Sequence, residues 1–224
     1  MKILLVLPIR EEIYAFLQAC TEHRVETIET KIGKLPVVFI PRLNLTLAEG
    51  GLGKVQFAVQ TQYLIDACTD WDFVICAGAA GALVSDLSIG DIVIATKTIE
   101  HDILNRFGKP LLPRFQSAAT IVDDLKHVQL STNSVKIWFG PIASGDEDVV
   151  DANRRRELHQ QTGALAVAWE GAGGARACKF SDVPFVEIRG ITDGADFSAA
   201  ESFRVNLEIA IKSVASLIIE WLVK

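Results

Sequence analysis

Short apolar runs alternate with longer amphipathic stretches along this chain. A continuous apolar run of about four to eight residues is typical of a buried strand, and apolar residues three and four apart are typical of a helix. Buried strands are predicted at 3–7, 73–77, 92–95, 135–139, 164–169 and 184–188, and a strand meander at 25–30, 35–40 and 43–48. Helices are predicted at 11–19, 55–67, 151–161, 171–178 and 199–223, the last with an apolar stripe on Leu207, Ile211, Val214, Ile218 and Trp221.

The alternation of apolar strands with helices is typical of an α/β fold. The meander at 25–48 favours a mixed sheet over a purely parallel one. No repeat, low-complexity segment or linker interrupts the chain. We therefore predict a single domain over 1–224, a three-layer α/β/α arrangement with a mixed central sheet. Residues 103–134, which include Pro110 and Pro113, give no clear pattern.

Composition and charge narrow the choice of partners. The chain has 224 residues, of which 50% are hydrophobic and 22% charged, with a net charge of −6. An acidic protein lacks the basic face that binds nucleic acid, and the arginine triplet at 154–156 is better explained as a solvated helix face. The apolar run at 3–7 is too short for a signal peptide or a membrane span. The four cysteines are scattered and are interpreted as free thiols, which is typical of a reducing compartment. We therefore expect a cytoplasmic protein that binds a small molecule, with no nucleic acid and no membrane partner.

Polar residues follow several of the predicted strands. Arg189, Asp193 and Asp196 come after the strand at 184–188. In open α/β sheets, ligands bind at the carboxyl ends of the strands, although turns use the same residue types. Small or acidic segments follow other predicted strands in the same way: 10–12, 78–81, 144–148 and 170–174. We expect these strand ends to converge on one pocket.

The chemistry of such a pocket would depend on carboxylates. Glu12, Glu170 and Asp193 fall near predicted strand ends, together with Arg189. The histidines and cysteines lack the spacing of a metal site, and no nucleophile elbow, P-loop or dinucleotide motif is present, so we expect neither metal nor cofactor. Carboxylates alone suit acid/base hydrolysis, in which an acid protonates the leaving group and a base activates water. Cleavage of a glycosidic bond is the natural case.

Several segments, taken in order, resemble the motifs of one known family. They lie at 1–12, 51–55, 76–81, 87–93, 144–146 and 189–196. Gly51-Leu52-Gly53-Lys54-Val55 is similar to a G-[IL]-G-K-V loop, and the segment at 189–196 to R-x-I-[ST]-D-x-A-D. Each piece alone is weak, but the ordered set is specific. Over nearly its whole length the chain resembles the nucleoside phosphorylase/nucleosidase superfamily, and within it the 5′-methylthioadenosine/S-adenosylhomocysteine nucleosidases.

The resemblance implies roles for the acidic residues. Asp193 would protonate N7 of a purine, and Glu12 would hold and activate the attacking water with Arg189 close by. Glu170 would bind the ribose 2′- and 3′-hydroxyls and stabilise positive charge on the sugar in the transition state. Structural explanations compete with these roles. Asp193 can be a turn or helix cap, and Glu12, or Glu11 in its place, can be a first-turn acid favoured by the helix dipole.

The chain departs from the family pattern on the substrate side. Ala168-Trp169-Glu170 stands in place of E-M-E, Gly78-Ala79-Ala80-Gly81 in place of G-S-A-G, and Asp148 in place of the aromatic that stacks on adenine. A carboxylate cannot stack, but it can accept a hydrogen bond from N1–H of a 6-oxopurine. The alternative is that Asp148 points to solvent. By the same resemblance we expect substrate contacts at Gly78, Ala79, Ser144, Asp148, Trp169 and Glu170, and at Phe107, in a segment that would reach the neighbouring pocket of a homodimer.

We predict phosphate-independent hydrolysis of the N-glycosidic bond of a purine nucleoside. Phosphorylases of this superfamily bind phosphate through arginines, one of them just before the G-[ST]-x-G loop, where this chain has Ile75-Cys76-Ala77. The alternatives are a phosphate-dependent purine nucleoside phosphorylase, a futalosine hydrolase-like enzyme, and a nucleoside-binding protein that has lost turnover. The intact set of Glu12, Glu170 and Asp193 argues against the last.

Overall fold

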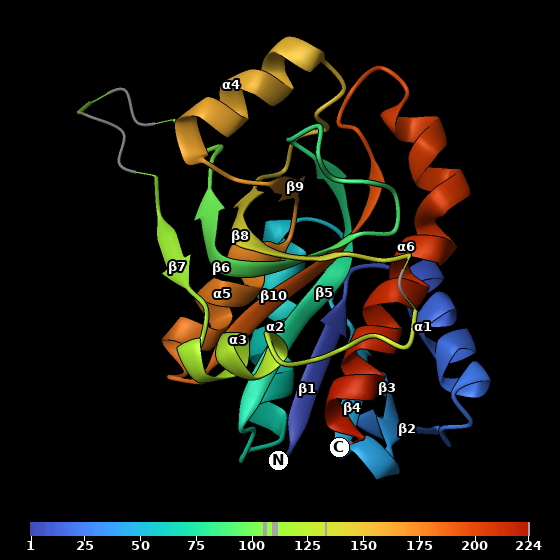
Figure 1. Ribbon diagram of the computed structural model, residues 1–224. Helices are drawn as coiled ribbons and strands as arrows, with labels where there is room; N and C mark the ends of the chain where they lie inside the picture. Colours follow the sequence, from blue (N-terminus) through green and yellow to red (C-terminus); the bar gives the residue numbers. More distant parts are fainter. Residues whose placement is uncertain (105–106, 109–111, 133, 224) are drawn as a thin grey trace.

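The strands of this protein form one mixed sheet that is covered by helices (Figure 1). The computed structural model describes residues 1–104, 107–108, 112–132 and 134–223. In this part of the chain the strands are β1 (Ile3–Leu7), β2 (Ile28–Ile32), β3 (Leu35–Ile40), β4 (Leu45–Glu49), β5 (Phe73–Ala82), β6 (Ile92–Glu100), β7 (Arg114–Gln116), β8 (Ile137–Ser144), β9 (Ala166–Ala168) and β10 (Phe185–Asp193). The helices are α1 (Arg10–Glu22), α2 (Lys54–Ala67), α3 (Ala119–Leu125), α4 (Ala152–Thr162), α5 (Gly171–Phe180) and α6 (Ala199–Leu222), with a short 3-10 helix, η1 (Pro41–Leu43).

One half of the sheet closes on itself. Across the described residues the strand order is β10-β6-β8-β9-β5-β1-β4-β3-β2, and β10 also pairs with β5. The strands β5, β10, β6, β8 and β9 therefore form a ring, from which β1, β4, β3 and β2 extend as an open sheet. β1 runs parallel to β4 and β5, whereas β2, β3 and β4 form the predicted antiparallel meander. The mixed α/β fold is confirmed, and closure of the ring is a long-range feature that local patterns do not encode.

Alternate residues of β1 show how helices cover both faces of the sheet. Ile3, Leu5 and Leu7 belong to a core that includes residues of α1 and α6, and these two helices lie together on the right of Figure 1. Leu4 and Val6 belong to a second core, which includes residues of α2 and α5. Because both faces are covered, a strand of this kind is apolar at every position rather than at alternate ones.

Several strands extend further than the sequence pattern predicts, among them β6, which continues to Glu100. β5 continues to Ala82, β8 to Ser144 and β10 to Asp193, so the residues expected in loops after these strands are their last residues. Backbone pairing explains the extension. β10 runs parallel to β5 with Arg189 opposite Gly78, and neither a charged side chain nor a glycine interrupts the pairing.

α1, α2, α4, α5 and α6 begin and end close to the predicted positions, whereas α3 lies in the segment 103–134, for which the sequence predicted no element. α4 begins after Asp151, whose carboxylate accepts hydrogen bonds from two backbone N–H groups of the first turn, and ends at Gly163, with a φ of +67°. Within the described residues no helix is long and apolar enough to cross a membrane. The predicted stripe of α6 belongs to the core at Ile211, Val214, Ile218 and Trp221, with Leu207 packed against it.

Candidate active site

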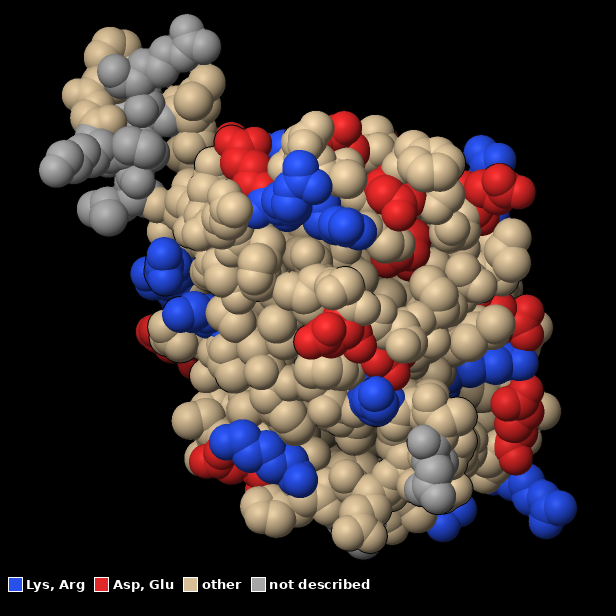
Figure 2. Space-filling model, turned by 45° about the horizontal axis from the view of Figure 1, so that its top comes forward, with Lys and Arg blue, Asp and Glu red and all other residues tan. Residues whose placement is uncertain are grey.

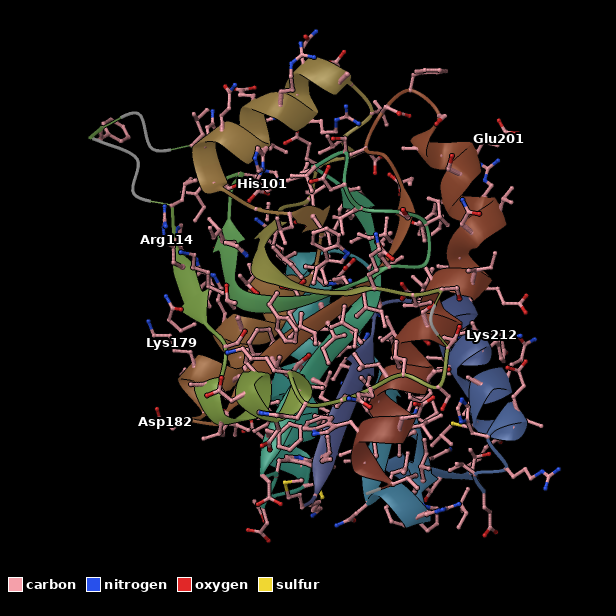
Figure 3. All side chains as sticks on the ribbon, in the orientation of Figure 1. His101, Arg114, Lys179, Asp182, Glu201 and Lys212 are labelled. Atoms are coloured by element: carbon pink, nitrogen blue, oxygen red, sulfur yellow. The ribbon has the colours of Figure 1, made fainter. Side chains whose placement is uncertain are left out.

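A cavity of about 400 Å³ opens where β1, β5 and β10 end. The last residues of β5 and β10, Pro8 and Ile9 after β1, and Glu12 in the first turn of α1 form its floor. The segment 147–150, Trp169 and the start of α6 form its rim. In Figure 3, Glu201 near the start of α6 marks this end of the molecule, and Asp182 before β10 marks the opposite end. Figure 2 turns the top of the molecule forward and shows acidic and basic side chains interspersed on that face. The strand ends converge on this cavity, as the sequence pattern predicts.

Glu12 lies on the floor of the cavity, in the first turn of α1. Its buried carboxylate accepts hydrogen bonds from the backbone N of Ala79 at 2.8 Å and of Ile9 at 3.3 Å. Burial raises the pKa of Glu12 to about 7, assisted by the charge of Glu170 and opposed by the Ala79 hydrogen bond. A carboxylate with such a pKa can accept a proton near neutral pH. Glu11, the competing residue, is exposed and does not line the cavity.

Arg189 is the largest fully buried side chain of the described residues. Its Nε donates to Glu187 at 2.9 Å. Its Nη1 lies 3.4 Å from both the Glu170 carboxylate and the carbonyl oxygen of Ala79. A buried charge is tolerated when it is paired and hydrogen-bonded, and this arginine has carboxylates on two sides. Glu187, Arg189, Glu170 and Glu12 therefore form one buried cluster of charges, which we call the floor cluster.

Two glycines of β5 leave room for the acidic residues. Gly78 has a φ of +152°, and a Cβ there would lie 2.6 Å from Nη1 of Arg189 and 3.0 Å from Oε1 of Glu12. A Cβ on Gly81 would lie 2.8 Å from Oδ1 of Asp193. Only glycine fits at these two positions of β5, because the acidic and basic side chains of the site pack directly against the strand there. Gly78 itself lies behind the cavity lining, whereas Ala79 belongs to that lining.

Asp193 ends β10 and lies in the wall of the cavity. It accepts hydrogen bonds from the Thr192 hydroxyl at 2.8 Å and from the backbone N of Ala195 at 2.9 Å. Burial raises the pKa of Asp193, and these two hydrogen bonds oppose the shift. A raised pKa suits a carboxyl group that donates a proton. Asp196 instead accepts hydrogen bonds from Ser198 at the start of α6 and does not line the cavity.

Glu170 forms the side of the cavity next to α5. It is buried, and its Oε1 accepts a hydrogen bond from the backbone N of Gly53 at 3.3 Å. Burial raises the pKa of Glu170, and the charge of Arg189 opposes the shift. The glycine-rich loop at 50–53 thus contacts a carboxylate of this chain through the backbone of Gly53.

Ser144 and Trp169 have different relations to the cavity. Trp169 lines it, and its Nε1 donates to the backbone oxygen of Glu147 at 3.1 Å. Ser144 is fully buried and does not line it. The Ser144 hydroxyl donates to the backbone oxygen of Trp169 at 2.6 Å and accepts from the backbone N of Ala172 at 2.8 Å. The expected substrate contact at Ser144 is therefore corrected: this side chain supports the turn that carries Trp169 and Glu170.

The rim of the cavity consists of more exposed side chains. Asp148 lines it with an exposed side chain, and Phe203 and Arg204 line it from α6. Phe107 is exposed and lies outside the cavity lining of a single chain. Residues 105–106 of the same segment lie outside the described residues.

Two arginines of α4 hold the loops of the rim. Arg154 donates to both carboxylate oxygens of Glu147, at 2.7 and 2.8 Å. Arg155 donates to the backbone oxygen of Gly194 at 2.8 Å. The arginine triplet predicted to be a solvated helix face is therefore partly structural. Paired guanidinium and carboxylate groups of this geometry fix orientation as well as charge.

Glu187, which lies beneath the cavity and does not line it, is a buried charge that the pattern of strand ends does not indicate. It is a charged residue inside an apolar strand, and a buried carboxylate needs a partner, so its position was a usable signal. Phe203 and Arg204 gave no such signal. They reach the cavity because α6 packs back along β10, where a Cβ on Gly190 would overlap the backbone of Ala210.

A family model described as the phosphorylase superfamily matches residues 2–222. The chain belongs to the phosphorylase superfamily. This membership confirms the resemblance seen in the ordered motifs. A related protein of the superfamily, the 5′-methylthioadenosine/S-adenosylhomocysteine nucleosidase of Geobacillus thermodenitrificans, is 33% identical over 224 residues, which cover 95% of this chain and 92% of that protein.

Two solved structures are similar to this fold. One is the 5′-methylthioadenosine/S-adenosylhomocysteine nucleosidase from Neisseria meningitidis in complex with methylthio-immucillin-A. It has a TM-score of 0.85 and 28% identity, covering 99% of this chain and 98% of that chain. The other is the futalosine hydrolase of Helicobacter pylori, with a TM-score of 0.84 and 28% identity, covering 99% and 97%. Both named activities are hydrolytic.

Proposed function

We propose that this protein hydrolyses the N-glycosidic bond of a purine nucleoside, as its nucleosidase relatives are named for doing. The observation that carries the proposal is the placement of Glu12, Glu170 and Asp193 around one cavity with Arg189 buried beneath them. The reaction adds water across the bond between the sugar and the base. Its products are the free base and the ribosyl compound.

The proposed roles follow from the surroundings of each carboxyl group. Asp193, whose pKa burial raises, donates a proton to N7 of the departing base. Glu12, with a pKa of about 7, takes a proton from the attacking water. Glu170 accepts hydrogen bonds from the ribose hydroxyls, and its charge stabilises the cationic sugar of the transition state.

Water is the favoured nucleophile because of the charges at the floor. An incoming phosphate dianion would meet Glu12 and Glu170, while Arg189, the buried arginine beside them, is already bonded to Glu187. Arg10 is exposed, pairs with Glu49 and does not line the cavity. The third arginine, Arg204, lines the cavity only at its rim, so no unpaired cation lies on the floor among the described residues to support the phosphorylase alternative.

The residues at the rim favour a different base from the adenine that is bound by family members with a stacking aromatic at this position. Asp148 lines the cavity but cannot stack on a purine. If it faces the base, its carboxylate meets N1–H of a 6-oxopurine favourably and the N1 lone pair of adenine unfavourably. The futalosine hydrolase similarity is consistent with a substrate outside the methylthioadenosine class.

A nucleoside panel read by chromatography tests the proposal. Methylthioadenosine, S-adenosylhomocysteine, futalosine, inosine and guanosine are incubated with the protein, with and without phosphate. We expect release of free base from at least one nucleoside at a rate that phosphate does not change. Formation of ribose 1-phosphate only when phosphate is present would establish a phosphorylase, and binding without base release would establish a protein that has lost turnover.

We also propose a homodimer, as the resemblance implies. Leu52, Val55 and Val59 lie at the start of α2 and are 60%, 74% and 63% exposed, a group of apolar side chains next to the cavity rim. Contiguous exposed apolar patches mark interaction sites in many proteins. Light scattering at micromolar concentration should give twice the chain mass, and Val55→Glu should shift it toward the monomer. A wild-type monomer with full activity would refute the dimer.

A further inference from the structure

Glu187 is a carboxylate with no exposure to solvent, placed in the middle of β10 below the cavity. It does not line the cavity, so it cannot touch a substrate. Its Oε1 accepts a hydrogen bond from Nε of Arg189 at 2.9 Å, and its Oε2 accepts one from the hydroxyl of Thr98. Neighbouring strands of the ring thus supply both partners: β10 carries the arginine and β6 carries the threonine.

The surrounding backbone is shaped to hold this carboxylate. It lies against Gly171, the first residue of α5, where a Cβ would overlap both carboxylate oxygens. The start of a helix is a favourable position for a negative charge. A buried ion pair is often no more stable than two apolar residues in place of both partners, so stability is a poor explanation for the pair of Glu187 and Arg189.

Glu187 controls how the charge of Arg189 is directed. Because Nε is bonded to Glu187, the plane of the guanidinium is set, and Nη1 is directed at Glu170 and the carbonyl of Ala79. The floor cluster then holds three carboxyl groups against one guanidinium, so Arg189 cannot neutralise Glu12 fully. An arginine without Glu187 would be free to turn toward the cavity carboxylates and hold both as anions.

We propose that Glu187 is a positioning residue of the nucleosidase site: it fixes the guanidinium of Arg189 and withholds part of the positive charge of Arg189 from Glu12, so that the Glu12 carboxylate stays basic enough to take a proton from water. The kinetic part of this inference rests on the proposed function. The groups that face Glu187 and Arg189 are Thr98 from β6, Cys76 from β5, Glu170 from the turn before α5 and Glu12 from α1.

The test is a titration of the Glu12 carboxyl by carbon-13 NMR, assigned by its loss in Glu12→Gln. It compares the wild type with Glu187→Gln, and with Glu100→Gln as control. Glu100 is also buried and ion-paired, to Lys54 and Arg176, but is not part of the floor cluster. We expect Glu187→Gln to lower the pKa of Glu12 by about one unit, as a nearby positive charge does, and Glu100→Gln to leave it unchanged.

Kinetics supply the second readout. In Glu187→Gln we expect kcat to fall roughly tenfold with little change in KM, and the acidic limb of the pH profile to move down with the Glu12 pKa. An unchanged titration and an unchanged limb, whatever the loss of thermal stability, would overturn the proposal.

If Glu187→Gln does not fold, Thr98→Val removes the donor to Glu187 and keeps every charge. A severalfold fall in kcat at constant KM is then expected, and wild-type kinetics would refute the role. A wild type that cleaves no nucleoside would refute the nucleosidase function alone, because the titration needs no substrate.

Discussion

The floor and the rim of the cavity are built on different principles. On the floor, Glu12, Glu170 and Arg189 are buried, and each is bonded to backbone groups or to an opposite charge. At the rim, Asp148 and Arg204 are exposed side chains at the surface of a loop and a helix. The floor depends on many mutual contacts, whereas a rim side chain can change at little cost to the fold. Reaction type should therefore be tied to the floor, and substrate choice to the rim.

The largest expected effect on kcat comes from Asp193, which lies in the wall of the cavity next to the floor cluster. Asp193→Asn keeps the shape of the side chain but removes the proton donor, so kcat should fall by about 10²-fold or more, which is typical for loss of a general acid. Asp196→Asn, three residues further on and outside the cavity lining, is the matched control and should stay near wild type. Steady-state base release measures both. Equal losses in the two variants would mean that this loop acts structurally.

Gly78→Ala tests whether the floor tolerates a single added carbon. The new Cβ would collide with Arg189 and Glu12, and small misplacements of catalytic groups cost up to about 10²-fold in rate, so we expect a loss of about 10- to 100-fold. Gly163→Ala is the control. Gly163 also has a positive φ, of +67°, but open space around it, so it should lose stability and keep activity. Thermal melts and rate measurements on both variants distinguish backbone strain at the glycine from displacement of the Arg189 and Glu12 side chains.

The pH profile reports the charge state of the floor. Burial holds the pKa of Glu12 at about 7, and the proton acceptor must be deprotonated, so Glu12 should give a limb on which kcat/KM rises with pH up to about 7. Below that pH the rate should fall about tenfold per unit. Asp193, which must be protonated to donate, should give a separate limb on which kcat/KM falls as pH passes the raised pKa of that carboxyl group. The residual activity of Glu12→Gln should lack the rising limb. A rising limb that persists in Glu12→Gln would assign it to another group.

The smallest effect on kcat is expected at the rim, from Asp148. Asp148→Asn and Asp148→Phe should each leave kcat for the preferred nucleoside within about threefold, because neither touches the floor. The ratio of kcat/KM for methylthioadenosine to that for inosine should rise in Asp148→Phe, since an aromatic stacks on adenine and a base stack contributes about 1–3 kcal/mol in comparable sites. If that ratio is already tenfold or more in the wild type and does not move, Asp148 does not read the base.

The acidic residues of the site could be found from the sequence because they stand at the ends of apolar strands. Asp193 and Glu170 follow continuous apolar runs that predict buried strands, and α/β sheets bind ligands at the carboxyl ends of their strands. Ser144 shows the limit of this reasoning. It follows a strand in the same way, yet its hydroxyl is bonded to the backbone of Trp169 and Ala172. Whether a polar side chain at a strand end faces a cavity or a turn depends on partners distant in the sequence.

The sequence by itself determined most of the strands and helices outside residues 103–134, the mixed α/β class and the carboxylates Glu12, Glu170 and Asp193, because apolar periodicity and motif order are local properties of the chain. Only the tertiary structure decided that β10 closes a ring with β5 and β6, that Glu187 meets Arg189 and Thr98 beneath the cavity, and that α6 brings Arg204 to the rim. The physical reason is the same in each case. The pairing of strands and the burial of charge are satisfied between residues far apart along the chain, and their energies depend on geometry that no local pattern records.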